Sequence, residues 1–320
     1  MKALYLTTHF KEIDEVLLSC KDRPVPALSA GQCLVQICSA GVNPSDVLGT
    51  LGYFPHAKLP RIPGRDFSGM IVKGDPKLVG KRIWGTGGAA GLDFDGTHAE
   101  FALIPESAIA EIPKNLSLIQ AGAQTLPFVT AYYSLVSRAR IQPGESVLII
   151  GALGQVGYAA MSICFWKKCK PIALVRKDTD LQRARSLKWE AYNALPAHLS
   201  FDAILNTIGN VQWNELLRSL NPYGRMVVIA APEGKREAQI SLLELYRKNQ
   251  NILGINSVGQ DYMQSAKILN EMKPGFESGE LASLPIDPST IFALDEAKKA
   301  YNLVYKGSSG RRVVLLINDI

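Results

Sequence analysis

The sequence predicts an α/β protein of two domains, a mostly antiparallel β domain followed by a domain built on a doubly wound parallel sheet. Before Ala121, short alternating runs are broken by Gly and Pro, as is typical of antiparallel strands and tight turns. After it, apolar runs of strand length alternate with helical patterns. The chain has 320 residues, which is long enough for each domain to bury its own core.

The alternation of strands and helices defines the second domain, which we expect over residues 122–259. Because a strand–helix–strand unit joins parallel strands by a crossover, the pattern predicts a parallel sheet covered on both faces. The strands are expected at 147–150, 172–175, 203–205, 226–230 and 252–255, and the helices at 155–168, 179–188, 213–220 and 242–249.

The first domain is expected over residues 1–121. Its strand candidates are the runs QCLVQICSAG, GMIVKG, GKRIWGTGG and HAEFALIPE. The tail from Ile291 onward has a helical segment, a Gly/Ser turn and a final strand, and by its own pattern it could complete either domain.

Cysteine and histidine spacing favours a protein without a metal. The five cysteines include no C-x-x-C pair, and the four histidines include no H-x-x-x-H pair. Cys33 and Cys38 lie in an alternating stretch, so we interpret them as buried thiols of a strand.

Charge and hydropathy favour a cytoplasmic protein that binds small anions. The net charge is +6, but the positive residues are spread out and form no stripe for a nucleic acid. We find neither a secretory signal pattern in MKALYLTTHFKEIDEV nor an apolar stretch of membrane-spanning length. Neither a membrane nor a nucleic acid is therefore an expected partner.

The stretch VLIIGALGQVG, residues 147–157, predicts a phosphate-binding turn. Read against the dinucleotide fingerprint G-x-G-x-x-G, it has Ala152 at the first position and glycines at the second and third. The second glycine lets the backbone approach a pyrophosphate, and the third lets the helix pack closely on the strand. The N–H groups at the start of the helix then face the phosphates. The residues expected to contact the cofactor here are Gly151, Ala152, Gly154, Gln155, Val156 and Gly157.

The end of the second strand favours NADP(H) over NAD. NAD sites usually carry an acidic residue about 20 residues beyond the glycines. This strand ends with Val175, Arg176 and Lys177 instead. Two cations suit a 2′-phosphate. The alternative is that Arg176 and Lys177 are only a solvated strand end before Asp178 and Asp180.

With these features together, the chain resembles the medium-chain dehydrogenase/reductase superfamily, in particular its zinc-free quinone oxidoreductase branch. The resemblance runs over nearly the whole length. It rests on the motifs AGVNPSD, PGRDFSG, GKRIWG, GTHAEFALIP, TLPFVTAYYSL, VLIIGALGQVG and the terminal GRRVVLL. Zinc-using relatives have a cysteine and a Gly-His-Glu segment, whereas this chain reads GVNPSD and has Arg65 at the histidine position.

The resemblance implies a GroES-like β-barrel domain, completed by residues 260–320, and a Rossmann domain over 122–259, with the active cleft at their junction. It also implies a homodimer joined through the last strand of the Rossmann sheet. Asn43 and Thr130 are expected beside the nicotinamide and ribose, and Arg311 or Arg312 is expected to reach toward the cofactor. Further contacts are expected at the strand ends, from Asn206, Thr207, Ile208, Ala230, Ala231, Ile255 and Asn256.

Some positions depart from the family pattern or allow a simpler interpretation. Leu48 stands where quinone reductases often have a tyrosine, although Tyr53 follows nearby, and Ala194 replaces an aromatic residue on the adenine side. Asp46 is interpreted as part of a helix start and not as a catalytic carboxylate. The Thr130 hydroxyl could instead bond to the backbone of its own helix.

The expected activity is hydride transfer from NADPH to a quinone or an α,β-unsaturated carbonyl compound, without zinc. The candidate catalytic residues are Asn43, Tyr53 and Thr130, with Asn43, Tyr53 or a backbone N–H donating to the carbonyl oxygen. Two alternatives stay open. One is an enoyl-CoA-type reductase, and the other is a cofactor-binding regulatory or RNA-binding protein with little turnover.

Overall fold

The computed structural model describes residues 1–16, 18–232, 234 and 236–320, which divide into two compact units. Unit 1 comprises residues 1–126, 258–278 and 283–320, and unit 2 comprises residues 127–257 and 279–282. The long helix α2, Leu118–Tyr132, contains the division after Leu126. Within the described residues, no helix combines the length and the apolar character needed to cross a membrane.

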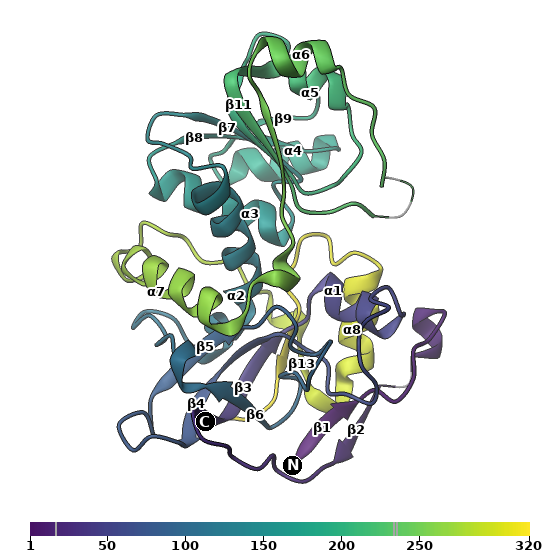
Figure 1. Cartoon of the computed structure of the whole chain (residues 1–320), viewed down its shortest axis with the longest axis vertical. Coiled ribbons are helices and arrows are strands. Elements are labelled where there is room, and N and C mark those ends of the chain that lie inside the picture. The colour runs from purple at the N-terminus through teal and green to yellow at the C-terminus, as the bar shows by residue number, and fades with distance from the viewer. Residues whose placement is uncertain (17, 233, 235) are drawn as a thin grey trace. The chain divides into compact units, whose positions relative to one another are not determined.

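Unit 2 is a doubly wound domain, as the sequence predicts. Its six parallel strands, of which Figure 1 labels β7, β8, β9 and β11, lie in the order β12-β11-β10-β7-β8-β9. The chain runs outward from β7 through β8 to β9 and returns to β10 on the other side of β7, which is the strand order of a Rossmann domain. The strands are β7 Ser146–Ile150, β8 Lys170–Leu174, β9 Glu190–Tyr192, β10 Phe201–Asn206, β11 Leu220–Val228 and β12 Asn251–Gly254.

The helices of unit 2 follow the predicted segments closely. They are α3 Gln155–Trp166, α4 Asp178–Ser186, α5 Trp213–Ser219 and α6 Leu242–Arg247. The core against β10 is made of apolar side chains such as Leu148, Ile204 and Leu217, all fully buried. The sequence did not reveal β9, because three residues are too short a run to show alternation.

Unit 1 is a β domain in which β3 is the central strand. The order is β13-β14-β3-β4-β5, and β6 also pairs with β3. Its elements are β1 Lys2–Tyr5, β2 Ser19–Asp22, β3 Gln32–Gly41, α1 Pro44–Thr50, β4 Asp66–Lys73, β5 Arg82–Thr86, β6 Phe101–Pro105, α7 Tyr262–Ser278, β13 Ile291–Ala293, α8 Ala297–Tyr305 and β14 Val314–Leu316.

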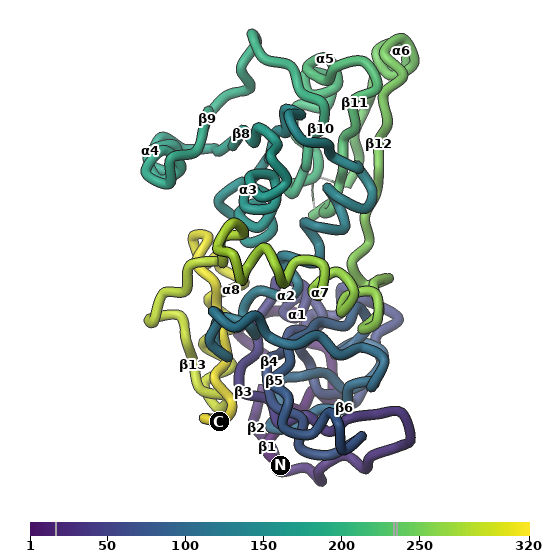
Figure 2. Tube along the Cα trace, turned by 90° about the vertical axis from the view of Figure 1, so that its left-hand side faces the viewer, coloured from purple at the N-terminus to yellow at the C-terminus, as the bar shows by residue number. Residues whose placement is uncertain are grey.

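The C-terminal tail is built into the sheet of unit 1. Strand β14 pairs antiparallel with β3, with Val314 opposite Gly41 and Leu316 opposite Ser39. Figure 2 shows this yellow segment beside the purple N-terminal strands. Helix α8 packs its buried residues Ala297, Ala300 and Tyr301 into a hydrophobic core of unit 1 that also contains Leu315 of β14.

Candidate functional site

The glycine turn between β7 and α3 has the shape that a dinucleotide cradle requires. Gly151 has a φ of +78°, in the left-handed region that favours glycine, and a Cβ there would clash with the Thr207 hydroxyl. A Cβ at Gly157 would clash with the Gly151 carbonyl oxygen. Close packing of α3 on β7 therefore depends on Gly157, as the fingerprint predicts.

Gly154 has a different role from Gly157: the space beside it is open, so the absence of a side chain leaves the start of α3 accessible. It is the N-cap of α3 with a φ of −75°, and an added Cβ would meet only the Gly151 oxygen, at 3.2 Å. No side chain of the N-cap closes the start of the helix. An anion can therefore approach the backbone N–H groups at the positive end of the α3 dipole, so the residues present fit a pyrophosphate.

The carboxyl ends of the parallel strands lie level with one another. Ile150 at the end of β7 pairs in register with Leu174 of β8 and with Asn206 of β10, and Asn206 pairs with Val228 of β11. The chain reverses its strand order between β7 and β10, and ligands of open α/β sheets bind at such a point. The register thus brings the predicted strand-end residues to one edge of the sheet.

Arg176 and Lys177 follow β8 at this edge. Both are exposed, and within the described residues their side chains make no ion pair or hydrogen bond. The nearest acidic residue in sequence, Asp178, accepts a hydrogen bond from the Asn193 amide at 2.7 Å. Two exposed cations without a partner among the described residues therefore follow β8 at the carboxyl edge of the sheet.

The other predicted strand-end residues differ in how much of each side chain is available. The Asn206 side chain is fully buried and bonds the Ile208 and Gly209 amides and the Gly209 carbonyl. Thr207 donates to the Ile150 carbonyl at 2.7 Å. Asn206 and Thr207 therefore shape the turn, and the Asn206 carbonyl also accepts from the Ile229 backbone N–H at 3.2 Å. Val175 is buried. The other predicted strand-end residues are partly buried or exposed, namely Ile208, Ala230, Ala231, Ile255 and Asn256.

Thr130 lies in the part of α2 that belongs to unit 2. It is 7% exposed, and its carbonyl accepts a hydrogen bond from the Ser134 hydroxyl at 2.7 Å. The Thr130 hydroxyl itself makes no hydrogen bond to the residues that the structure describes. Its role beside the cofactor stays a prediction.

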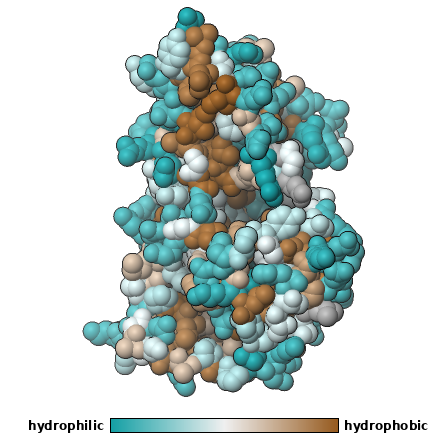
Figure 3. Space-filling model, turned by 45° about the vertical axis from the view of Figure 1, so that its right-hand side comes forward, coloured by the Kyte–Doolittle hydropathy of each residue, from teal (hydrophilic) through white to brown (hydrophobic). Residues whose placement is uncertain are grey.

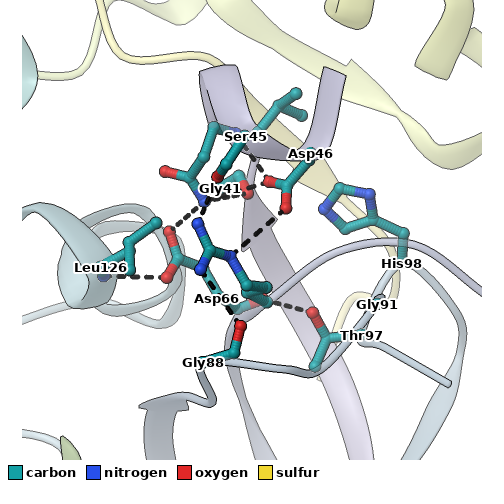
Figure 4. Close-up of polar contacts among 12 residues, drawn as sticks. Gly41, Ser45, Asp46, Asp66, Gly88, Gly91, Thr97, His98 and Leu126 are labelled. Carbon is teal, nitrogen blue, oxygen red and sulfur yellow. Dashed lines mark hydrogen bonds and ion pairs between the residues drawn. The ribbon is translucent and has the colours of Figure 1, made fainter. Parts of the chain in front are cut away.

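Unit 1 contains a buried polar cluster centred on the Asp66 carboxylate (Figure 4). One carboxylate oxygen accepts from the Thr125 hydroxyl at 2.7 Å and from the Leu126 amide at 2.8 Å. The other accepts from the Asn43 amide at 2.9 Å and forms a 2.6 Å ion pair with Arg312. Both oxygens of the buried Asp66 carboxylate therefore accept hydrogen bonds from the chain.

Asn43 links this carboxylate to that of Asp46. Its side-chain amide donates to Asp46 at 3.1 Å and to Asp66 at 2.9 Å, and its oxygen accepts from Arg312 at 2.9 Å. Its backbone N–H donates to Asp46 at 2.8 Å, which supports the start of α1 as the helix-start interpretation predicts. Burial raises the pKa of Asp46, against the opposing charge of Arg65. Asn43 keeps no free amide hydrogen for a substrate.

The remaining two candidates of unit 1 lie nearer the surface. Tyr53 is 47% exposed in the turn after α1. Arg311 is half exposed and lies 3.4 Å from Asp287, whereas its neighbour Arg312 is 1% exposed and bonds Asp66. Alternation along the terminal strand could not tell which of the two arginines points inward. The contact of Arg311 with the cofactor stays a prediction.

Two family models match the chain, one in each half. The alcohol dehydrogenase GroES-like domain matches residues 29–114, and the family described as zinc-binding dehydrogenase matches residues 156–271. A zinc-type alcohol dehydrogenase-like protein of Schizosaccharomyces pombe is 35% identical over 298 residues, which are 92% of this chain and 90% of that protein. The chain belongs to the medium-chain dehydrogenase/reductase superfamily. It is therefore an oxidoreductase with a GroES-like domain and a Rossmann domain.

More distant members of the superfamily cover the same length. Human quinone oxidoreductase is 27% identical over 94% of both chains, and tomato 2-methylene-furan-3-one reductase is 26% identical over 91% of this chain and 73% of its own. The solved quinone oxidoreductase of Thermus thermophilus, described with its NADPH complex, is 26% identical, with a TM-score of 0.79 over 99% of this chain and 100% of that one.

The donor set of this superfamily member does not fit a catalytic zinc ion. At the position where zinc-using members have histidine, the Arg65 guanidinium is 2% exposed, donates to the Ser45 hydroxyl and lies 3.8 Å from Asp46. A guanidinium is always charged, so it is no ligand and repels a cation. No group of three His, Cys, Asp or Glu side chains that could hold a metal occurs in the described part of the chain.

Sequence reasoning missed the central residues of the polar cluster. Asp66 and Thr125 appear there only as letters of the motifs PGRDFSG and TLPFVTAYYSL, and Arg312 is predicted only as an alternative to Arg311 for a contact with the cofactor. One sequence signal could have revealed this cluster: Arg312 stands directly before an apolar strand, and a charged side chain buried in such a place requires a partner of opposite charge.

Proposed function

We propose that the protein uses NADPH to reduce a conjugated carbonyl compound, either a quinone or an α,β-unsaturated ketone or aldehyde, without a catalytic metal. The observation that carries the cofactor preference is the pair of exposed cations, Arg176 and Lys177, which have no acidic partner within the described chain. The named activities of the human, tomato and Thermus relatives support the substrate class.

In this proposal the chain binds and orients, and NADPH when bound supplies the hydride. Gly151, Gly154 and Gly157 let the backbone N–H groups of α3 hold the pyrophosphate. Arg176 and Lys177 hold the 2′-phosphate. Thr130, whose hydroxyl has no partner among the described residues, is proposed to bond the nicotinamide ribose.

The cofactor preference is tested by titration with NADPH and NADH while nicotinamide fluorescence is followed. We expect the wild-type protein to prefer NADPH at least about tenfold, because charge-assisted bonds to the phosphate are lost with NADH. Arg176→Ala should weaken NADPH binding about tenfold and leave NADH binding unchanged. Arg185→Ala removes an exposed arginine from the last turn of α4 and serves as the matched control. Equal affinity of the wild-type protein for both nucleotides would refute the preference.

The substrate class is tested in the same preparation. NADPH oxidation is followed with quinones, enones, alkenals and enoyl-CoA esters, and elemental analysis is expected to find no stoichiometric zinc. Turnover of the thioesters alone would favour an enoyl-CoA-type reductase. Inactivity on every compound, with NADPH still bound, would favour a regulatory protein.

We also propose a homodimer joined along β12, which is an edge strand of the sheet in unit 2. Its Ile252 is 36% exposed, and Leu242 and Tyr246 of α6 are 69% and 64% exposed. Figure 3 shows apolar side chains gathered on the visible face of this unit. An unpaired strand edge with apolar neighbours is a template for pairing with another chain.

The cytoplasmic location expected from the sequence stays a prediction.

A further inference from the structure

Three buried polar side chains of unit 1 surround the dipeptide Gly87–Gly88 and have unused hydrogen-bonding groups. Thr86 is 1% exposed, and its hydroxyl has no hydrogen-bond partner in the part of the chain that the structure describes. Arg65 donates to the Gly88 carbonyl at 3.2 Å, while its Nε lies 3.8 Å from Asp46 and has no hydrogen-bond acceptor among the described residues. The hydroxyl of Tyr262, a residue 9% exposed, likewise makes no hydrogen bond to a described residue. Because unpaired buried donors cost stability, their gathering at one loop indicates a place for a ligand acceptor.

The Tyr262 ring is fixed in position by its surroundings. It is the first residue of α7, and a Cβ on Gly87 would lie 2.6 Å from two of its ring carbons, so the ring lies directly on that glycine. The Gly88 amide donates to the Gln260 carbonyl at 2.7 Å. The Asp261 carboxylate accepts from the Gln264 amide at 2.8 Å, which caps the helix start.

Two further aromatic rings complete the surroundings of Tyr262. Its ring centroid lies 6.2 Å from that of Phe67, which is fully buried, and 6.2 Å from that of Phe94, which is 49% exposed. One hydroxyl donor among aromatic rings, with one ring open to solvent, suits a planar apolar molecule that carries a single strong acceptor.

Burial, with a negative charge nearby, keeps the Tyr262 hydroxyl protonated and therefore able to donate a hydrogen bond. Burial, together with the negative charge of Asp66, raises the pKa of Tyr262, so the phenol stays protonated at neutral and alkaline pH. The Tyr262 hydroxyl does not donate to the Asp66 carboxylate. The oxygens of that carboxylate accept instead from four other groups, those of Thr125, Leu126, Asn43 and Arg312. Asp66 also stands opposite Thr86 in the pairing of β4 with β5.

We propose that Tyr262 donates the hydrogen bond that holds the carbonyl oxygen of the substrate. The inference rests on the proposed function, to which it adds a specificity-determining residue that the sequence did not reveal. The ligand class is a planar conjugated carbonyl compound, with its carbonyl oxygen at Tyr262 and its carbon skeleton against the exposed ring of Phe94.

The test compares Tyr262→Phe, which keeps the ring, with Tyr305→Phe, which removes a hydroxyl from an exposed tyrosine of α8. Binding of benzalacetone is measured by calorimetry without cofactor, and β-methylstyrene serves as the matched ligand without the carbonyl. Tyr262→Phe should weaken benzalacetone binding about tenfold and leave β-methylstyrene and NADPH binding unchanged, whereas Tyr305→Phe should change none of them.

The outcomes separate this inference from the proposed function. Benzalacetone binding that is equal in wild type and Tyr262→Phe, or absent from the wild type, overturns the role of Tyr262. So does an unchanged KM for enone reduction in Tyr262→Phe, which leaves the reductase activity standing. Tyr262-dependent binding without reduction of any conjugated carbonyl overturns the proposed function and supports the binding role.

Discussion

At the scale of single residues, His98 shows how burial changes the pKa of a side chain. It is fully buried in unit 1, where one ring nitrogen lies 2.8 Å from the Tyr301 hydroxyl. Burial lowers the pKa of His98 to about 4; Asp66 opposes this shift and Arg312 adds to it. The imidazole is therefore neutral in the folded protein, and a neutral ring can keep its bond to Tyr301 without a buried charge.

The first prediction concerns acid stability. Between about pH 6.5 and pH 4 the unfolded chain binds a proton on His98 that the folded chain does not bind, so stability falls as the pH is lowered through this window. The contribution of this one group reaches about 3 kcal/mol. His98→Gln, which can still bond Tyr301, should give a shallower loss in urea unfolding measured from pH 7 to pH 4.5. The exposed His56→Gln is the control, and a slope unchanged by His98→Gln would contradict the prediction.

At the scale of elements, the β7–α3 turn separates two functions of glycine. Gly157 provides space for the packing of a helix on a strand, and Gly154 provides access to the backbone. Both functions follow from the absence of a Cβ, but only the first is needed for the fold itself. Two alanine substitutions, three residues apart, can therefore distinguish stability from binding.

The second prediction is made for this pair. Gly157→Ala should lower the free energy of unfolding by about 2 kcal/mol or more, because α3 must move away from the Gly151 carbonyl, and should weaken NADPH binding as well. Gly154→Ala should change stability little, since its Cβ meets one atom at 3.2 Å, but should weaken NADPH binding. Urea unfolding and NADPH titration measure the two quantities. Equal losses of stability in both variants would show that the turn does not separate them.

At the scale of the whole molecule, the unpaired edge strand β12 leaves apolar side chains in contact with water. Tyr223 is 69% exposed beside it, and α6 buries none of its residues within the chain. A helix without a buried face gains little stability from its own chain. This surface is the one to which the proposed homodimer assigns the partner copy.

The third prediction is that sedimentation equilibrium finds twice the mass of one chain, and that Ile252→Lys shifts the protein to monomer. A lysine on an edge strand carries its charge into the pairing surface and opposes association. Phe165→Lys, on an exposed position of α3, adds the same charge elsewhere in unit 2 and should leave the dimer intact. A wild-type protein that stays monomeric at high concentration would rule the interface out.

The sequence by itself determined the fold class, and it predicted the glycine turn proposed here to hold a nucleotide. Strand runs, helical spacing and the glycines at 151, 154 and 157 are local signals, because backbone geometry and alternation act within a few residues. They correctly predicted five of the strands of unit 2 and its helices, and they missed β9, which is three residues long.

Only the tertiary structure decided which polar groups are already bonded and which remain available. It turned Arg312 inward instead of Arg311, used the amide of Asn43 between Asp46 and Asp66, and placed Tyr262 on Gly87. These contacts join segments far apart in the chain. A hydrogen bond is made by one donor and one acceptor that meet in space, and local periodicity carries no information about that meeting.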